Sequence, residues 1–428
     1  MISRITFECL TCGQKTTVRT AVGHSDYQEF GFPCPKCSIE IRYGMELHLN
    51  KQMRQFASEG LTWADGMRRF SESKMNPLEY VKLKNAITCP SEAGLPIRTF
   101  DGETLNPVPE EDYITPFLAT IWLPKNRETF HKHQNARQTA ADKYWPQIYR
   151  LLTHLDRKQW DLFDKQFQEL QIRAADVSEV GKIKAAFDAV ECWENLFAPD
   201  TDHAREFVHK RIVMARATSR TLVSDLVEFF KAKGKDESIN RELFLIRDRW
   251  ARYYKFLHLI YLRFYWDDSR NRIESFTIAE KRFEELKLFY VDCFETFCRI
   301  STIAAGIEGI IYKSALGVPL SKRVMSLDEF DDMANGNKRA LLQQLRIADL
   351  FAPFIDSNLR NGIGHHAAHF DAASDSINYT VGKDKNVLNL QIKYTSFCDQ
   401  VVALYRQLHV VSRYAHWLRK SVLGVSDA

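Results

Sequence analysis

Apolar residues recur every three to four positions over most of the chain after residue 116, which is the period of an amphipathic helix. The pattern breaks where Pro, Gly and polar residues cluster, for example at residues 198–200 and 233–236. It therefore predicts helices over residues 136–155, 158–170, 178–196, 202–233, 238–266, 280–311, 338–344, 347–360 and 395–423.

Alternating apolar and polar residues predict strands at both ends of the chain. Near the N-terminus, the strand-like segments are residues 4–8, 16–22 and 39–49. Near the C-terminus, residues 376–381 and 386–392 alternate on either side of a turn that begins at Gly382, so a β-hairpin is expected. The expected fold class is mainly α, with a small N-terminal β domain and a hairpin in the C-terminal helical bundle.

Changes in composition divide the chain into four parts. Residues 1–50 form the small β domain, and residues 51–116 are a mixed segment with one helix expected near residues 63–72. From residue 89 to 116 the chain is rich in Pro, Gly and acidic residues, which is typical of a linker. Residues 117–274 form a helical middle domain and residues 275–428 a helical C-terminal domain. A length of 428 residues suffices for two or three domains with a large core.

Two pairs of cysteines give the strongest local signal in the sequence. Cys9 and Cys12, and Cys34 and Cys37, have the Cys-x-x-Cys spacing that places two thiolates on one metal ion. Two such turns complete a tetrahedral four-thiolate site, so the segment resembles a zinc ribbon. The expected cofactor is one structural Zn²⁺ per chain, because four thiolates leave no coordination position for a substrate.

Charge and hydropathy narrow the class of protein. Lys and Arg number 59 and Asp and Glu 55, and this net charge of +4 is too small to indicate nucleic acid by itself. The start of the chain is polar, without the pattern of a signal peptide, and the most apolar stretch, residues 300–311, is interrupted by Glu308. The remaining cysteines are scattered and form no disulfide framework. We therefore expect a cytoplasmic protein that does not cross a membrane.

The most informative stretch for chemistry is Ile355 to Asp371. Arg360 and Asn361 fall where the preceding helix is expected to end, because Gly362 favours the left-handed conformation after a last turn. His365 and His366 follow directly. A fixed cation, an amide and imidazoles that titrate near neutral pH can bind a phosphate and move a proton beside it.

Arg360-Asn361 followed by His365 fits the Arg-x4–6-His motif of HEPN domains, and residues 275–423 are similar to that family in their helical context. The resemblance implies a helical bundle that dimerises with both motifs facing one cleft. It also implies a metal-independent ribonuclease, of the kind that acts in bacterial anti-phage defence, in abortive infection or as a toxin. The implied partners are an RNA substrate (transfer RNA is one candidate), a second copy of the chain and a phage-derived trigger or regulator.

The same resemblance assigns roles to individual residues. Arg360 would bind the scissile phosphate, Asn361 would orient the phosphate or the histidine, and His365 would act as general acid or base. His366 also satisfies the motif spacing, and His369 lies nearby, so the catalytic histidine stays open among the three. The expected products are a 2′,3′-cyclic phosphate and a 5′-hydroxyl.

Two other readings stay open. In the first, the chain is a non-catalytic zinc-ribbon and HEPN-like protein that binds nucleic acid or serves as a scaffold. In the second, it is a zinc-ribbon protein that acts on DNA. In a purely structural reading, Arg360 forms an ion pair with Asp356 one turn away. Glu308 either pairs with Arg360 or faces solvent, and small residues from Ala304 to Gly309 suit close helix packing, including a dimer interface.

Basic and aromatic positions in the middle domain have a functional and a structural reading. Either of two groups of basic side chains could contact a phosphate backbone. One is a stripe at Arg205, His209, Arg216 and Arg220, and the other is a basic segment at Lys125, Arg127, His131, Lys132, His133 and Arg137. The structural reading of both is a solvated helix face. The aromatic residues between Trp250 and Trp266 surround their helix on all sides, which favours a packed core over a stacking surface.

Overall fold

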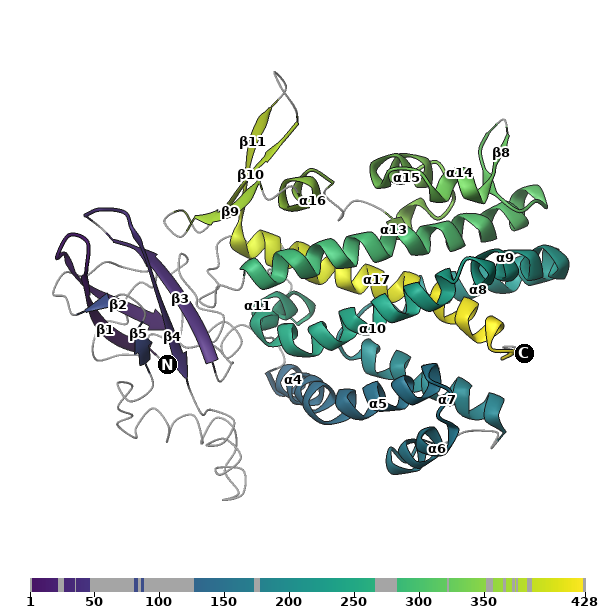
Figure 1. Cartoon of the computed structure of the whole chain (residues 1–428), viewed down its shortest axis with the longest axis horizontal. Coiled ribbons are helices and arrows are strands. Elements are labelled where there is room, and N and C mark those ends of the chain that lie inside the picture. Colours follow the sequence, from purple (N-terminus) through teal and green to yellow (C-terminus); the bar gives the residue numbers. More distant parts are fainter. Residues whose placement is uncertain are drawn as a thin grey trace. The chain divides into compact units, whose positions relative to one another are not determined.

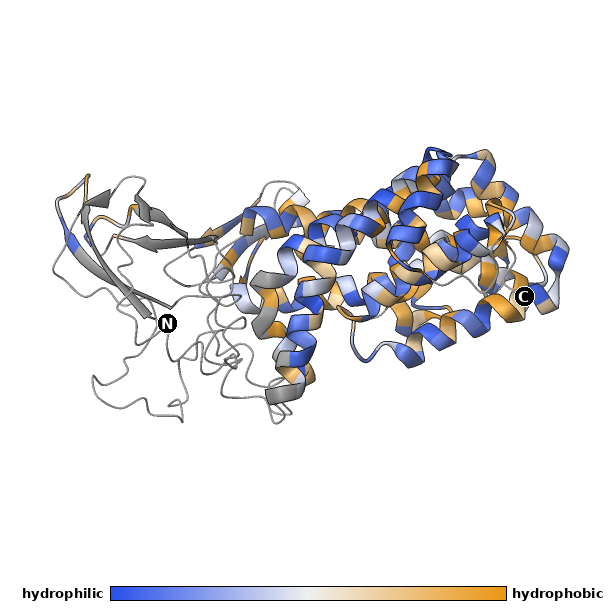
Figure 2. Cartoon of the chain, turned by 90° about the horizontal axis from the view of Figure 1, so that it is seen from below, coloured by the Kyte–Doolittle hydropathy of each residue, from blue (hydrophilic) through white to orange (hydrophobic). Residues whose placement is uncertain are grey.

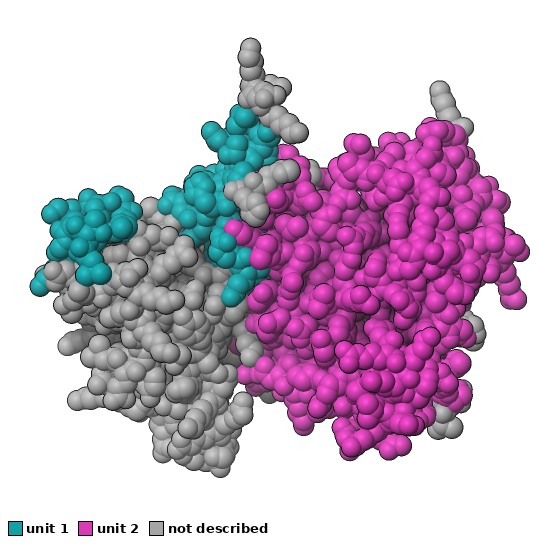
Figure 3. All heavy atoms as spheres, in the orientation of Figure 1, with its two compact units in different colours: residues 1–130, 255–286, 365–399 teal, residues 131–254, 287–364, 400–428 magenta. Residues whose placement is uncertain are grey.

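The computed structural model describes residues 2–21, 27–34, 36–46, 81–83, 86–87, 127–172, 178–265, 283–321, 323–351, 357–364, 367–371, 374, 376–382 and 387–425. The chain forms two compact units, each assembled from several segments (Figure 3). Unit 1 contains residues 1–130, 255–286 and 365–399, and unit 2 contains residues 131–254, 287–364 and 400–428. Unit 2 thus combines helices from both sides of residue 274. Independent folding of the four expected parts stays a prediction.

The N-terminal part of unit 1 is built from short antiparallel strands. β1 (Ile2–Cys9) pairs with β2 (Lys15–Ala21), and β3 (Tyr27–Pro33) pairs with β4 (Glu40–Glu46). β6 (Ala86–Ile87) extends the first pair along β1, and β5 (Val81–Leu83) extends the second along β4. The three expected strand segments are confirmed, and β3 was not predicted. The helix expected near residues 63–72 and the linker at 89–116 lie outside the described residues.

A third three-stranded sheet of unit 1 follows the segment from Arg360 to His366. β10 (Ser376–Val381) pairs with β11 (Leu388–Lys393), which confirms the expected hairpin. Gly382 has a positive φ of 96° at the turn, a conformation that side chains disfavour. β9 (Ala368–Asp371) adds a third strand that the sequence analysis did not predict. Residues 254–264 form only short helical turns: η3 (Tyr254–Leu257), α11 (His258–Tyr261) and η4 (Leu262–Phe264). Tyr254 belongs to unit 2, and the residues after it belong to unit 1.

Helices make up most of the rest of the described chain (Figure 1), which confirms the expected mainly α fold class. They are α4 (Arg127–Thr139), η2 (Ala140–Tyr144), α5 (Trp145–Asp156), α6 (Trp160–Glu169), α7 (Glu179–Asn195), α8 (Asp202–Thr218), α9 (Arg220–Ala232), α10 (Lys235–Tyr253), α13 (Phe283–Lys313), α14 (Leu327–Asp331), α15 (Asn335–Leu342), η6 (Ala348–Phe351), α16 (Ser357–Gly364) and α17 (Tyr394–Val422). β7 (Val318–Pro319) and β8 (Val324–Met325) form a small hairpin after α13. Hydrophobic and hydrophilic residues alternate along these helices (Figure 2). Among the described helices, none has the length and hydropathy needed to cross a membrane.

Two of the expected helices are interrupted. The helix expected over residues 202–233 is wrong as a single element, because Ser219 has an extended backbone and its hydroxyl accepts a hydrogen bond from the Leu222 N–H as the N-cap of α9. The helix expected over residues 238–266 ends at Tyr253, and the aromatic residues beyond it lie on the short turns. Periodicity alone missed these breaks because apolar spacing continues across a tight helix–helix junction.

The core of unit 2 is centred on Trp250 of α10. Its fully buried ring stacks on Phe289 of α13 and on Tyr405 of α17, with ring centroids 5.5 and 3.9 Å away. Stacked aromatic rings contribute beyond the apolar area that they bury. Trp250, Tyr254 and Tyr261 are fully buried, which confirms core packing for these three aromatic residues, whereas Tyr253, Phe264 and Tyr265 are half-buried.

The small residues of α13 serve packing within the chain. A Cβ atom added at Gly306 would lie 2.7 Å from Leu226 of α9, and one added at Gly309 would lie 1.8 Å from the Gly317 carbonyl oxygen. Ala304 and Ala305 are fully buried. The hypothesis that this stripe forms a dimer interface is therefore wrong, because unit 2 itself covers it.

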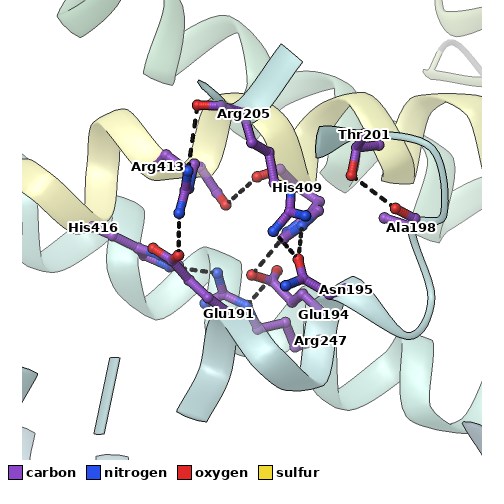
Figure 4. A network of polar contacts seen from close by, with 11 residues as sticks. Glu191, Glu194, Asn195, Ala198, Thr201, Arg205, Arg247, His409, Arg413 and His416 are labelled. Atoms are coloured by element: carbon purple, nitrogen blue, oxygen red, sulfur yellow. Dashed lines mark hydrogen bonds and ion pairs between the residues drawn. The ribbon is translucent and has the colours of Figure 1, made fainter. Parts of the chain in front are cut away.

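A network of buried charges joins α7, α10 and α17 (Figure 4). Glu194 of α7 accepts a hydrogen bond from Nε of Arg247 at 2.7 Å, and its other oxygen lies 3.1 Å from Nδ1 of His409. All three residues are at most 2% exposed. Charges removed from water are tolerated only in well-formed pairs, so this contact fixes the three helices relative to one another.

The hydrogen bonds of the network distinguish its two histidines. Nε2 of His416 lies 2.6 Å from Nη2 of Arg247, which can only donate, so this ring nitrogen accepts and the proton is on Nδ1. Nδ1 faces an oxygen of Glu191 at 3.6 Å. Both ring nitrogens of His409 instead face acceptors, because Nε2 lies 3.0 Å from Oδ1 of Asn195. The two imidazoles thus have different partners: a guanidinium lies beside His416 Nε2, and a carboxylate and an amide oxygen lie beside His409.

Burial and neighbouring charges shift the pKa values of the network. Burial and the Arg247 guanidinium lower the pKa of His416 below 6.5. Burial raises the pKa of Glu194, but Arg247 and His409 together have the larger effect and lower the pKa from 4.5 to about 2. Burial also raises the pKa of Glu191, and His416 and Arg413 together bring it below its ordinary value of 4.5.

Acidification is expected to destabilise unit 2 from about pH 6.5 downward. At that pH the unfolded chain begins to protonate His416, whereas the folded chain resists until its lowered pKa is reached, so the unfolded state binds more protons. This contribution to the free energy of unfolding is complete above pH 6.5 and is lost as the pH falls toward the lowered pKa. The thermal unfolding midpoint of the helix signal, followed from pH 8 to 5 (roughly the range of histidine titration), measures it.

His416→Gln separates this effect from general acid sensitivity. The Gln side chain can still accept from Arg247 but does not titrate, so the decline between pH 6.5 and about 5 is expected to be shallower. His203→Gln on α8 changes an exposed histidine and is expected to leave the decline as it is in the parent chain. Equal declines in the parent and in His416→Gln would contradict the assignment.

Candidate functional site

Arg360 and Asn361 lie inside a helix rather than at its end. α16 runs from Ser357 to Gly364, so the expectation that the helix ends before Gly362 is wrong. Leu359 and Ile363, four positions apart on one face, are at most 4% exposed and anchor the helix on either side of Gly362. Their packing outweighs the cost of glycine inside a helix, which is about 1 kcal/mol.

The Arg360 guanidinium is held by a carboxylate of α13. Nε of Arg360 lies 2.8 Å from Oε1 of Glu295, and Nη2 contacts the same oxygen. Nη1 donates to Oδ1 of Asn361 at 3.2 Å. Every nitrogen of the guanidinium therefore has a partner within unit 2. About a quarter of each side chain of the ion pair remains exposed, so both can still be reached from solvent.

Glu295 also connects Arg360 to α15. Its second oxygen accepts a hydrogen bond from Nδ2 of Asn335, the first residue of α15, at 2.5 Å. Beside this carboxylate lies a pocket of about 330 Å³. The residues that line it are Phe230, Lys235, Ser238, Ile239, Glu295, Arg299, Asp331, Met333, Asn335 and Lys338. Arg360, Glu295 and Asn335 thus form a polar chain at the edge of a small pocket.

The expected catalytic histidines are not placed. His365 and His366 lie outside the described residues, so their distances to Arg360 stay untested. His369 is exposed on β9, where it stands opposite Asn378 in the strand register. Asp356, the expected ion-pair partner of Arg360, also lies outside the described residues. The structure brings Arg360 and Asn361 together and leaves the rest of the motif as a prediction.

Glu295 was missed by the sequence analysis, and Glu308 was assigned to the wrong place. Glu308 is only 1% exposed, and one of its oxygens accepts from Nη2 of Arg211 on α8 at 2.6 Å. Both expected alternatives, a pair with Arg360 and a solvent-facing side chain, are therefore wrong. Burial raises the pKa of Glu308, and the nearby Arg211 guanidinium offsets this in part. In the sequence, Glu295 stands out only as an acidic residue between two apolar positions, Phe294 and Phe297, and this pattern does not predict that Arg360 is its partner.

The basic patterns of the middle domain are not continuous surfaces. Arg220 begins α9 after the break at Ser219, so it does not continue the stripe of α8. Arg205 in that stripe pairs with Asp202 and donates to Asn195. In the basic segment from Lys125 to Arg137, the Arg137 side chain is 1% exposed and therefore cannot contact a phosphate backbone.

The four N-terminal cysteines lie together at the ends of the two strand pairs of unit 1. Their sulfur atoms all lie within 4.8 Å of one another, so they could hold a metal ion. Sγ of Cys9 is 3.6 Å from Sγ of Cys37, and Sγ of Cys12 is 3.6 Å from Sγ of Cys34. A tetrahedral site with metal–sulfur bonds of about 2.3 Å has sulfur–sulfur edges of about 3.8 Å, so the spacing fits such a site.

The two cysteine turns have the same local structure. The Gly13 N–H donates to the Cys9 carbonyl at 2.8 Å, and the Ser38 N–H donates to the Cys34 carbonyl at 2.9 Å. Gly13 and Ser38 both have a positive φ, 66° and 59°. The repeated geometry follows from the repeated Cys-x-x-Cys spacing, and it aims two sulfurs of each turn at one point.

Backbone amides stabilise thiolates in both turns. Burial raises the pKa of the Cys9 thiol, but N–H groups of Cys12 and Thr11 donate to its sulfur and lower the pKa to about 6. Burial likewise raises the pKa of Cys34, and N–H groups of Cys37 and Lys36 bring it below its ordinary value. For Cys12, the Gln14 N–H lowers the pKa, but burial and the neighbouring cysteines raise it to about 12, and the pKa of Cys37 is also raised. Thiolates this close repel one another, so all four sulfurs would be ionised together only around a cation.

A metal ion added to the chain is expected to bind to all four sulfurs. Titration with Co²⁺ should give the absorption of a tetrahedral thiolate complex, which saturates at one ion per chain. Cys9→Ser and Cys34→Ser should each abolish or markedly weaken this spectrum, because each removes one of the sulfurs. Cys192→Ser, which changes an exposed cysteine of α7, should leave the titration unchanged. A four-thiolate spectrum retained by Cys34→Ser would contradict the site.

The described chain therefore contains two groups with possible chemistry: the four cysteines of unit 1, and Arg360 with Glu295, Asn335 and the adjoining pocket of unit 2. The first is a metal-binding arrangement. The second joins a guanidinium, a carboxylate and amides beside basic side chains. Comparison of the chain with protein-family models, curated proteins and solved structures gives no match.

Proposed function

We propose that the protein is a metal-independent endoribonuclease and that Arg360 binds the scissile phosphate. The observation that carries the proposal is the Arg360 guanidinium, which Glu295 and Asn361 hold in one orientation while about a quarter of its side chain stays exposed. A planar guanidinium pairs with two phosphate oxygens at once and keeps its charge at every relevant pH. The Arg-x4–6-His motif adds His365, four residues after Asn361, as the proton-transferring group.

The reaction needs two proton transfers and one charge neutralisation. The imidazole of His365 or His366 takes the proton of the 2′-hydroxyl, and the 2′-oxygen attacks the phosphorus. Arg360 neutralises the added charge on the phosphate oxygens, and the P–O5′ bond breaks as a protonated imidazole gives its proton to the leaving 5′-oxygen. The products are a 2′,3′-cyclic phosphate and a 5′-hydroxyl. A second copy of the chain would supply the second imidazole, so the proposed active form is a homodimer.

Glu295 would act on Arg360 as a positioning residue. Because the carboxylate accepts from Nε and Nη2, it fixes the guanidinium plane. A phosphate would reach Arg360 through Nη1, which contacts only the exposed Asn361, and would compete with Glu295 for Nη2. Glu295 would therefore orient Arg360 and set how strongly it attracts an anion.

The cellular role proposed with this activity is anti-phage defence, abortive infection or toxicity, with cleavage of RNA such as transfer RNA. The four cysteines would hold one structural Zn²⁺ per chain. In that role the metal joins the two strand pairs, and the N-terminal segment would sense a trigger or position the RNA. The ion would take no part in the cleavage.

A non-catalytic scaffold is the second candidate, and one observation favours it. All nitrogens of the Arg360 guanidinium have partners in the chain, as expected for a residue that only joins α16 to α13. In this case the HEPN-like part would dimerise or hold nucleic acid without cutting it. The two functions differ in whether RNA is cleaved.

RNA cleavage in the presence of EDTA tests the ribonuclease proposal. The purified chain is expected to cut total RNA or transfer RNA and to leave cyclic-phosphate ends. Arg360→Gln and His365→Ala are expected to reduce the rate by roughly 10²–10⁴-fold, the range for a placed acid or base and a charged phosphate ligand. His366→Ala and His369→Ala, measured in parallel, identify the catalytic histidine.

Arg252→Gln is the matched control, because Arg252 is an exposed arginine of α10 whose ion pair within the described chain is with Asp248. It should leave cleavage unchanged. The oligomeric state of each variant is measured by light scattering, so that loss of a dimer is not mistaken for loss of chemistry. No cleavage by the parent chain, either alone or in cells infected with phage, would support the scaffold instead.

Zinc removal is expected to affect the N-terminal segment alone. The purified chain should contain one Zn²⁺, and its release by a strong chelator should make residues 2–46 sensitive to limited proteolysis, because metal binding and folding are coupled in such small sites. The far-UV helix signal should change little, since the helices lie outside this segment. A large loss of helix on zinc removal would show that the metal supports more than the strands.

A further inference from the structure

The pocket beside Glu295 contains a lysine that is almost fully buried. Lys338 is 4% exposed and lies in the first turns of α15. Within the described chain its ammonium makes no hydrogen bond that the geometry supports, and its nearest carboxylate oxygen, on Asp331, is 3.9 Å away. Burial lowers the pKa of Lys338, as expected for a cation that lacks a close anion. A buried cation of this kind needs a partner, and the pocket provides the space for one.

Two helix N-termini face the same pocket. Asn335 is the first residue of α15, and Lys235 is the first residue of α10; both line the pocket. Neither helix has a side chain that caps its N-terminus, because the capping positions are Ala334 and Gly234. The N-terminal N–H groups of a helix carry a partial positive charge and bind anions. The uncapped N-terminus of α15, which has no acidic residue in its first turn, therefore favours a negatively charged occupant.

The other charged groups that line the pocket balance one another. Lys235 pairs with Asp331, and Arg299 pairs with Glu242. Glu295 is engaged by Arg360 and Asn335. Asp236 and Glu237 lie in the first turn of α10 and offset its N-terminal charge, whereas the first turn of α15 has no acidic residue. Lys338 and the N-terminus of α15 thus determine the sign of the preferred ligand.

We propose that this pocket binds the phosphate group of a small molecule, with Lys338 and the N-terminus of α15 as its main ligands. A volume of about 330 Å³ is at the lower end of small-ligand pockets, which suits a phosphate with a small organic part rather than a stretch of polymer. Phe230, Ile239 and Met333 line the same pocket and would contact the organic part. This binding does not depend on the proposed ribonuclease activity.

Calorimetric titration of the full chain tests the proposal, with inorganic phosphate, pyrophosphate and ribose 5-phosphate as probes. At least one probe is expected to bind at one site per chain. Lys338→Met should weaken this binding by about tenfold or more, since it removes a charge-assisted hydrogen bond. Arg252→Gln, which changes a residue that does not line the pocket, should leave the binding unchanged.

Ala334→Asp guards against a misfolded variant. Ala334 is exposed and has the extended backbone of an N-cap, so Asp there would cap α15 and should raise the unfolding temperature. The same carboxylate would occupy the N–H groups and repel a phosphate, so binding should weaken. Stabilisation together with loss of binding cannot arise from unfolding.

Three outcomes would overturn the proposal: no binding of any probe, equal binding by the parent, Lys338→Met and Ala334→Asp, or binding of a short 5′-phosphorylated RNA without binding of ribose 5-phosphate. The last result would assign the pocket to RNA rather than to a small molecule. His365→Ala separates this test from the ribonuclease test, because it should reduce RNA cleavage and it changes none of the residues that line the pocket, so phosphate binding should be retained. Failure of either proposal is thus visible without the other.

Discussion

The buried pairing of Glu194 with Arg247 and His409 is the constraint on which the arrangement of unit 2 depends. These charges lie in a low-dielectric interior, where an ion without its partner costs several kcal/mol, so α7, α10 and α17 have little freedom to slide past one another. Trp250, one turn from Arg247 on α10, then stacks on Phe289 and sets the position of α13. The charge pairing fixes the relative positions of the helices, and the aromatic packing fills the space between them.

The position of the candidate site follows from this frame. α13 carries Glu295, α10 begins at one side of the pocket with Lys235, and α15 begins at the other with Asn335. Arg360 joins the group only through Glu295, so its orientation depends on where α13 lies. A residue that binds phosphate in catalysis must be held but not fully neutralised, and an ion pair that stays partly exposed meets both conditions.

The cysteine site has a different physical origin. Each Cys-x-x-Cys turn closes through its own backbone hydrogen bonds, and the amide groups of the turn donate to its sulfurs. Only the meeting of the two turns requires a contact between distant residues, and a shared metal ion would supply the free energy for it. This explains how so small a segment can hold a defined geometry.

The sequence by itself determined the features that arise from local chemistry. Helical periodicity identified α5, α7, α13 and α17, alternation identified the hairpin of β10 and β11, and cysteine spacing identified the four sulfurs. Local signals also identified Arg360 and Asn361 as a pair, although the buried positions Leu359 and Ile363 carried their helix past Gly362.

Only the tertiary structure decided which charges meet. Glu308 and Glu295 lie on the same helix among similar neighbours, yet one is buried against Arg211 and the other holds Arg360. Nothing within a few residues of either carboxylate encodes this choice, because a partner depends on how α8, α13 and α16 pack. The same holds for Lys338, whose burial beside two helix N-termini exists only once α10 and α15 converge on one pocket.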